Sequence, residues 1–351
     1  MQFFESSVQL RTPPTTRYQG SKLKLLTWLR ANMADLEYDT VLDAFGGTGC
    51  VSYMLKDKGK SVTYNDHLHF NHVIGTAIIE NSRIRLSDDD QEFVLSRHAD
   101  IEYDDFIAQT FGGIYFTDDE NTWLDVACQN IPKLRGRFKR ALAYYALFQS
   151  CIVKRPYNLF HRKNLYMRIA DVERSFGNKA TWDTPFDEHF RGFVAEANAA
   201  VFDSALPCHA VHHDALQVPG DYDLVYIDTP YINKRGVGVD YFDFYHFLEG
   251  IVDYADWPDR INRQRKHLPL KGTKSAWSDR KRTKEAFERL FDRYSNAILV
   301  VSYRSDGIPS EHELIELMQA FKNEVCCVHF GEYRYVLSTN GKSKELLIIG
   351  K

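Results

Sequence analysis

Apolar and polar positions along this chain follow the rhythm of a parallel sheet covered by helices. Short apolar runs end in turns at Thr40–Ala44 and Ser61–Asn65, and a helical pattern between them continues to about Lys56. A strand, a helix and a second strand within about 30 residues are typical of a βαβ unit. The pattern therefore predicts an α/β fold built on a mostly parallel sheet.

The same pattern returns in the second half of the chain. Apolar runs of strand length predict three further strands, at Cys208–His213, Tyr222–Asp228 and Asn296–Tyr303. Amphipathic stretches predict helices near Lys281–Tyr294 and Glu311–Lys322. The last two apolar runs, Val325–Val336 and Glu345–Ile349, are expected to form an antiparallel pair at the edge of the sheet.

Between about Ser87 and Leu206 the βαβ rhythm stops. We interpret the chain as a doubly wound sheet interrupted by an inserted, more irregular module. Residues 1–86 would form the first part of the sheet domain, residues 87–206 the insertion, and residues 207–351 the second part of the sheet domain. A chain of this length usually holds about two domains, which agrees with this division.

Composition excludes several classes of protein. The chain has 351 residues, 44% hydrophobic and 26% charged, so it can bury a core and is not a disordered or coiled-coil protein. Its longest stretches without Asp, Glu, Lys or Arg, His67–Ile79 and Ala141–Val153, have 13 residues each. A membrane-spanning helix needs about 20. With no secretory signal and no C-x-x-C pair among six cysteines, we expect a cytoplasmic protein with no metal site.

Charge is distributed unevenly. The net charge is -4, yet three segments are strongly basic: residues 133–140, residues 154–168 and residues 260–284. The second of these, KRPYNLFHRKNLYMR, contains no acid and interleaves three aromatic residues with its bases. A mildly acidic chain with such segments can still present one basic face to a nucleic acid.

A glycine-rich turn follows the first predicted strand. The segment Asp43-Ala44-Phe45-Gly46-Gly47-Thr48-Gly49 precedes a helix, and Gly47 and Gly49 let the backbone approach a ligand closely. A dinucleotide fingerprint would place a third glycine at Ser52. The negative charge of Asp43 is unsuited to a pyrophosphate, but it suits a cofactor that carries an ammonium and a sulfonium.

Asp66 ends the second predicted strand, 23 residues after Asp43. A carboxylate in this position can accept hydrogen bonds from both hydroxyls of a ribose. The glycine turn and the two acids together favour S-adenosylmethionine over a nicotinamide cofactor.

A second polar motif, Asp228-Thr229-Pro230-Tyr231, ends the apolar strand YDLVYI. Asp228 and a backbone carbonyl can accept the two hydrogens of an exocyclic amine, and Tyr231 can stack on a flat ring. Pro230 fixes the backbone that orients the neighbouring carbonyls. Such acceptors favour a tetrahedral amine nitrogen that can attack a methyl sulfonium in line.

In this order, the motifs resemble those of the Dam-like N6-adenine DNA methyltransferases. In that family the cofactor motifs come first, then an inserted target-recognition region and then a catalytic Asp-Pro-Pro-Tyr motif. The resemblance extends from about Arg17 to Ile349 and implies a Rossmann-like, S-adenosylmethionine-dependent methyltransferase fold. Thr229 departs from the catalytic pattern, but the family uses the backbone carbonyl of this position, which threonine also provides.

The resemblance implies roles for further residues. Arg17–Lys22 matches the family's amino-terminal cofactor segment, which implies that Tyr18 and Lys22 lie near the methionine end of the cofactor. Asp214, after the strand at Cys208–His213, resembles the acid that meets the adenine ring of the cofactor.

The implied substrate is double-stranded DNA, from which the target adenine is flipped out of the stack. By hypothesis, Arg155, Arg162 and Lys163 contact phosphates or bases. The implied partner is a restriction endonuclease that acts on the same site. Two alternatives stay open at this point: a methyltransferase acting on RNA or protein, and a catalytically silent DNA-binding subunit that keeps the fold.

Overall fold

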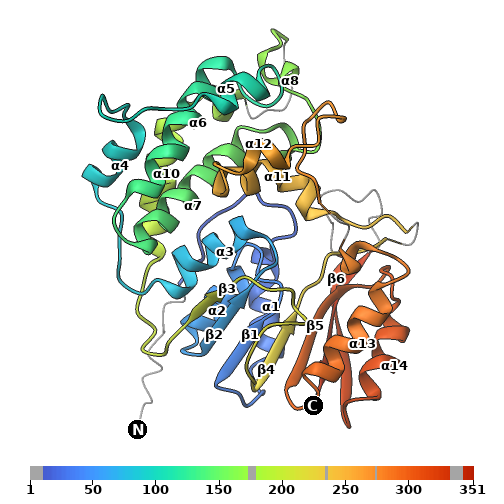
Figure 1. The fold of residues 1–351 in the computed structure, drawn as a ribbon. Helices are drawn as coiled ribbons and strands as arrows, with labels where there is room; N and C mark the ends of the chain where they lie inside the picture. Colours follow the sequence, from blue (N-terminus) through green and yellow to red (C-terminus); the bar gives the residue numbers. More distant parts are fainter. Residues whose placement is uncertain (1–10, 173–178, 234–235, 273–274, 333–342) are drawn as a thin grey trace.

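A seven-stranded sheet forms the base of the molecule in Figure 1. The computed structural model describes residues 11–172, 179–233, 236–272, 275–332 and 343–351. The strands are β1 (Thr40–Asp43), β2 (Ser61–Asn65), β3 (His209–Val211), β4 (Leu224–Ile227), β5 (Ile298–Arg304), β6 (Val325–Glu332) and β7 (Lys344–Gly350). Their order is β3-β2-β1-β4-β5-β7-β6, with β7 antiparallel to both neighbours and the other pairs parallel.

This arrangement confirms the predicted α/β fold, including the antiparallel edge pair. Residues 333–336 of the predicted run Val325–Val336 lie outside the described residues. The central strand β4 has no charged residue and all four of its residues are buried, because helices cover both faces of the sheet.

Two layers of helices enclose the sheet. They are α1 (Leu26–Asn32) after the 3₁₀ turn Leu23–Leu25, α2 (Cys50–Asp57), α3 (His69–Gly75) with the π-helical turn Thr76–Glu80, α13 (Thr283–Arg293) after the 3₁₀ turn Ala276–Ser278, and α14 (Glu311–Gln319). Side chains of α1, α2 and α3 join one hydrophobic core and those of α13 and α14 join another, so the two cores lie on opposite faces of the sheet.

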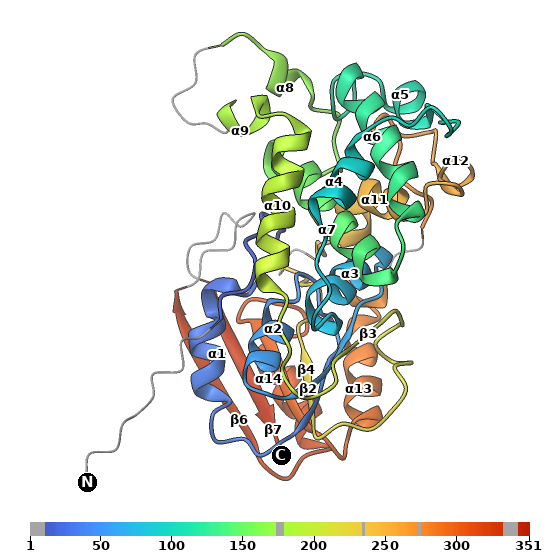
Figure 2. The same cartoon turned by 90° about the vertical axis from the view of Figure 1, so that its left-hand side faces the viewer.

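A helical layer lies above the sheet in both views (Figures 1 and 2). It comprises α4 (Asp88–Leu95), α5 (Phe106–Phe111), α6 (Asp118–Asn130), α7 (Arg137–Val153), α8 (Tyr166–Ile169), α9 (Lys179–Asp183), α10 (Phe186–Ala200), α11 (Tyr241–Val252) and α12 (Trp257–Arg260), with 3₁₀ turns at Ile131–Lys133 and Pro156–Asn158.

The expectation of an irregular insertion was wrong, because the insertion is largely helical. Ser87 and Thr117 each begin a helix with a capping box. The hydroxyl of the capping residue accepts from the backbone N–H three residues later, and the carboxylate of that later residue, Asp90 or Glu120, accepts from the backbone N–H of the capping residue. Residues 141–153 are all buried in α7, which explains their lack of charge. Among the described residues, none of the helices has the length and apolar character needed to span a bilayer.

Helix α11 comes from the second part of the chain but packs within the helical layer. The backbone N–H of Phe160 donates to the carbonyl of Phe244 at 2.9 Å. The ring of Phe160 stacks on Phe247 with centroids 5.2 Å apart and planes 3° apart. The helical layer is therefore not formed by residues 87–206 alone, because it also includes α11 from the second part of the chain.

Candidate active site

A cavity of about 320 Å³ lies at the carboxyl ends of β2, β1 and β4. This edge is where open α/β sheets bind ligands. Ten of the residues expected at the site line the cavity: Tyr18, Lys22, Asp43, Phe45, Gly47, Asp66, Asp228, Thr229, Pro230 and Tyr231. The fold thus brings together segments that are far apart in the chain, such as those of Lys22 and Asp228, which are separated by 206 residues.

The glycine turn has the backbone that its sequence requires. Gly47 and Gly49 have positive φ, at 51° and 73°, which glycine adopts at low cost. A Cβ on Gly46 would lie only 2.1 Å from the ring of Tyr64, so that position also excludes a side chain. The Tyr64 hydroxyl donates to the carbonyl of Gly47 at 2.7 Å. Gly49 is buried at the start of α2 and shapes the turn, but it does not line the cavity.

Asp66 is held in place by the backbone. Its carboxylate accepts from the N–H of Gly47 at 2.9 Å and from the N–H of Leu68 at 2.8 Å. Burial raises the pKa of Asp66, and these hydrogen bonds oppose the rise. The backbone therefore holds this acid in one orientation at the cavity.

Asp43 is the buried acid at the end of β1. Its Oδ2 accepts from the Ser52 hydroxyl at 2.6 Å, whereas Oδ1 is buried and has no hydrogen bond of good geometry in the described part of the chain, although the nearby backbone N–H of Phe45 weakly stabilises the carboxylate. Burial raises the pKa of Asp43 to about 7; the bond from Ser52 opposes this, and Asp228 and Asp66 add to it. A buried carboxylate oxygen in this state favours a cationic ligand.

Lys22, Asp228 and Tyr231 form one polar group. Lys22 Nζ lies 2.8 Å from Asp228 Oδ1, to which the Tyr231 hydroxyl also donates at 3.0 Å, and Lys22 contacts the Tyr231 hydroxyl directly. Burial raises the pKa of Asp228 to about 6, with Lys22 opposing the rise and Glu345 adding to it. Burial works against the charge of Lys22, but attraction to Asp228 and Glu345 outweighs it and raises the pKa of Lys22.

The aromatic residues Tyr18 and Tyr241 also line the cavity, and Tyr245 is buried behind Tyr18. Tyr18 stacks on Tyr245 at 4.4 Å and on Tyr241 at 5.6 Å between ring centroids, and Asn71 donates to its hydroxyl at 3.5 Å. Tyr241, Tyr245 and Asn71 were not anticipated. The aromatic run from Tyr241 to Phe247 is the sequence signal that could have found the first two.

Asp214 lies beside the main cavity rather than in it. It lines a neighbouring cavity of about 270 Å³, and the two cavities share Phe45, His67, Ser275 and Trp277. Phe45 meets the edge of Trp277 with ring centroids 4.9 Å apart. The two spaces therefore meet along one aromatic wall, next to the glycine turn.

The three basic residues expected at a DNA interface differ in position. Arg155 is completely buried, and its guanidinium donates to the carbonyls of Tyr115, Leu159 and Arg162. A direct DNA contact by Arg155 does not agree with this position, because the N–H groups of its guanidinium already donate hydrogen bonds to carbonyls of the protein. Arg162 and Lys163, by contrast, are exposed.

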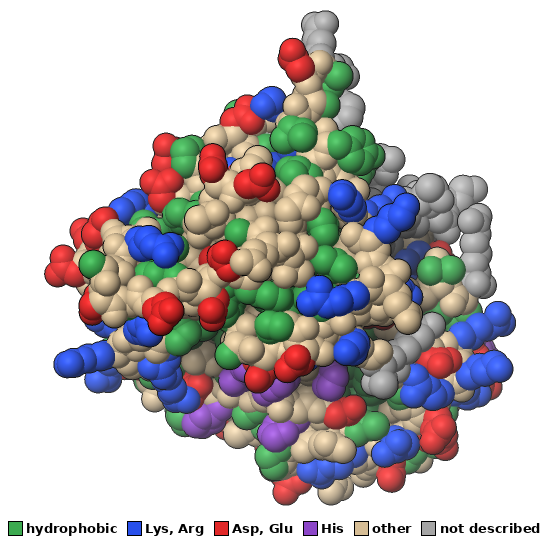
Figure 3. Space-filling view, turned by 45° about the horizontal axis from the view of Figure 1, so that its top comes forward, with side chains coloured by type: hydrophobic (Ala, Val, Ile, Leu, Met, Phe, Trp, Pro, Cys, Tyr) green, Lys and Arg blue, Asp and Glu red, His purple; other side chains and the backbone are tan. Residues whose placement is uncertain are grey.

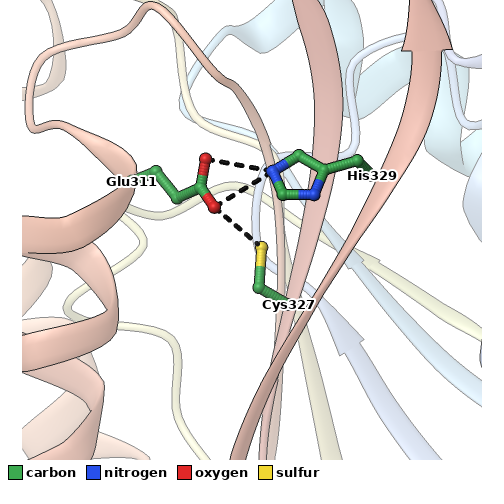
Figure 4. Close-up of side chains that lie close together, drawn as sticks. All are labelled: Glu311, Cys327 and His329. Atoms are coloured by element: carbon green, nitrogen blue, oxygen red, sulfur yellow. Dashed lines mark hydrogen bonds and ion pairs between the residues drawn. The ribbon is translucent and has the colours of Figure 1, made fainter.

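Two clusters of polar side chains lie outside the cavity. Glu311, Cys327 and His329 meet where α14 faces β6, and hydrogen bonds of 3.6 Å from the thiol and 3.0 Å from the imidazole to the carboxylate link them (Figure 4). His69 stacks on His212 at 5.1 Å, and Figure 3 shows histidines gathered on this face. None of these five residues lines the main cavity.

Comparison with known proteins identifies the family. A family model described as D12 class N6 adenine-specific DNA methyltransferase matches residues 18–300, which include all of the cavity motifs. The chain belongs to this family. This confirms the predicted resemblance and the predicted activity class, so the enzyme is an N6-adenine DNA methyltransferase.

Several known methyltransferases are similar along nearly the whole chain. Type II methyltransferase M2.HphI of Haemophilus parahaemolyticus is 25% identical over 346 residues, covering 96% of this chain and 97% of its own. Type II methyltransferase M.CviAII of Paramecium bursaria Chlorella virus 1 is 22% identical, covering 93% and 95%. Modification methylase StsI of Streptococcus sanguinis is 24% identical, and this chain spans 50% of its length.

Proposed function

We propose that this methyltransferase moves a methyl group from S-adenosylmethionine to N6 of an adenine flipped out of double-stranded DNA, at one specific sequence. The group of Lys22, Asp228 and Tyr231 beside the acid-lined glycine turn carries the proposal, because it combines an amine acceptor with a space for a cationic cofactor. Transfer of a labelled methyl group to adenine in DNA tests it.

The residues present fit S-adenosylmethionine. A cationic methionine end would compensate the buried carboxylate of Asp43, which burial otherwise destabilises in its charged form, and Tyr18 and Lys22 would lie near that end. Asp66 would accept from the ribose hydroxyls. Asp214 would meet the adenine ring of the cofactor in the neighbouring cavity, with Phe45 packed beside it.

The chemistry required of the protein is modest. When bound, the cofactor supplies a methyl group on a sulfonium, which leaves as a neutral thioether. Asp228 and the Thr229 carbonyl would accept the two hydrogens of the target amine, so that the nitrogen lone pair points at the methyl carbon. The amine nitrogen forms the new bond to carbon and then gives up one proton, which Asp228, with its raised pKa, is suited to receive.

Replacing Asp66 with alanine should weaken S-adenosylmethionine binding about 30-fold, because the ribose hydroxyls would lose a charged acceptor. Isothermal titration calorimetry with S-adenosylmethionine measures the effect. Asp203→Ala is a matched control, since Asp203 is an exposed acid paired with Arg83 at the surface. Wild-type affinity in Asp66→Ala would remove this acid from the cofactor site.

We further propose that residues 87–206 form the target-recognition region, with Arg162 and Lys163 at its DNA-facing surface. Both side chains are exposed, and the neighbouring Tyr157 is 60% exposed, which leaves this segment open to a partner.

The double substitution Arg162→Ala and Lys163→Ala should weaken DNA binding and make it less sensitive to salt. If each residue neutralises one phosphate, the slope of log K against log salt concentration should fall by about two. Fluorescence anisotropy with duplex DNA over a series of salt concentrations measures both quantities. An unchanged slope would exclude these two residues from the interface.

We also propose that the enzyme is the modification component of a restriction-modification system in a prokaryotic cytoplasm. The relatives named as type II methyltransferases and modification methylases support this assignment. A restriction endonuclease with the same recognition sequence would be the partner, and purified enzyme should protect the shared sites from it.

A further inference from the structure

Glu345 is a buried carboxylate that the sequence motifs do not include. It is the second residue of β7, the residues that follow it up to Gly350 are apolar or glycine, and its exposed fraction is 0%. Its Oε1 accepts from the Ser302 hydroxyl at 2.7 Å and lies 3.2 Å from Lys22 Nζ. It also lies 3.0 Å from the Tyr231 hydroxyl, whose single hydrogen can be donated either to Glu345 or to Asp228. Two of these three contacts are to the residues that hold Asp228.

The sheet itself does not require this charge. β5 and β7 pair in continuous register from Leu299–Gly350 to Arg304–Glu345, so the backbone already joins the two strands. A buried carboxylate is costly unless it is well paired, and an apolar side chain would complete the strand without that cost. Its position therefore calls for an explanation beyond packing.

The arrangement divides one positive charge between two carboxylates. Lys22 Nζ lies 2.8 Å from Asp228 and 3.2 Å from Glu345. Paired with Lys22 alone, Asp228 would be a weak proton acceptor, because a nearby cation stabilises its ionised form. Glu345 draws part of that charge away and repels the negative charge of Asp228.

We propose that Glu345 is a positioning residue for methyl transfer. Glu345 contacts Lys22 and Tyr231, the same two residues that contact Asp228, and thereby keeps Asp228 oriented and basic enough to accept hydrogens from the target amine. The inference rests on the proposed function, in which Asp228 meets that amine. The ionisable groups that face this pair from the surrounding elements are Lys22, Asp43, Tyr226, Tyr231 and Tyr241.

The test compares Glu345→Gln with the wild-type enzyme. Glutamine keeps the shape and one acceptor oxygen but removes the charge. The readout is kcat/KM for duplex DNA at saturating S-adenosylmethionine, from about pH 5 to about pH 9. Ionised Asp228 is the active form, so wild-type activity should fall as the pH drops through the pKa of Asp228, about 6.

In Glu345→Gln the charge of Lys22 is no longer shared with a second carboxylate, and the repulsion between Glu345 and Asp228 is lost, so the pKa of Asp228 should drop. The acid limb should therefore move to lower pH by about one unit, and the plateau should fall about tenfold because Asp228 accepts the amine hydrogens less strongly. Ser302→Ala is the matched control: it removes a hydrogen bond to Glu345 but leaves its charge, so the acid limb should stay in place whatever the rate.

Glu345→Asp provides a second variant if Glu345→Gln does not fold. The shorter side chain keeps the charge but withdraws it from Lys22 and Tyr231, so the acid limb should move in the same direction by less. An unmoved acid limb in the folded Gln variant, or in the Asp variant, overturns the inference even if the rate falls. Failure of the wild-type enzyme to methylate adenine would instead overturn the proposed function.

Discussion

Replacing Asp228 with alanine should lower kcat for methyl transfer by about 10³-fold or more, while affinity for S-adenosylmethionine stays within about threefold. Asp228 is the carboxylate that accepts from Lys22 and Tyr231 at the cavity wall, and in our account it also accepts from the target amine. Without it the amine keeps its delocalised lone pair, and the proton released by methylation has no nearby acceptor.

Single-turnover methylation of duplex DNA and calorimetric titration of the cofactor separate these two effects. Asp221→Ala is the matched control, because Asp221 is an exposed acid on the loop that leads into β4. It should keep wild-type kinetics. A near wild-type rate in Asp228→Ala would show that the amine is bound elsewhere.

Replacing Arg155 with alanine should destabilise the fold by about 3–5 kcal/mol, because it leaves several buried carbonyls without a donor. Its guanidinium bonds to Tyr115 at 2.8 Å, Leu159 at 3.2 Å and Arg162 at 3.1 Å. These contacts close the loop that presents Arg162 and Lys163, so loss of DNA binding in this variant would follow from loss of structure.

Urea denaturation followed by circular dichroism measures the free energy of unfolding. Arg162→Ala, an exposed neighbour on the same loop, should change it by less than about 0.5 kcal/mol. If Arg155→Ala proved as stable as the wild-type protein and lost only DNA affinity, the original expectation of a direct DNA contact would be restored.

The sheet was predictable because its strands carry a local signal. Runs such as LVYI in β4 contain no charged residue, and they end at polar residues where the strands meet the cavity. The insertion was misjudged because α7 is buried on all sides from residue 141 to residue 153, so that this part of the helix shows no amphipathic period. The capping boxes at Ser87 and Thr117 were the local signals that indicated helices.

The residues of the site were predictable only where they belong to a recognisable sequence motif. The residues around Asp43, Asp66 and Asp228 lie in recognisable segments, each following a strand. Glu345 contacts Tyr231 from 114 residues away, and nothing near it in the sequence marks it as part of the site. The charge of Arg155 was visible, but whether a basic residue faces solvent or the core depends on packing that one sequence does not reveal.

The measurement that tests the central claim most directly is methyl transfer from labelled S-adenosylmethionine to unmethylated mixed-sequence DNA. Mass spectrometry of the digested product identifies the modified base, and sequencing locates it. We predict label on N6 of adenine within one short, fixed sequence, and no label with Asp228→Ala. Label on another base, or no label on DNA by an enzyme that binds the cofactor, would contradict the account.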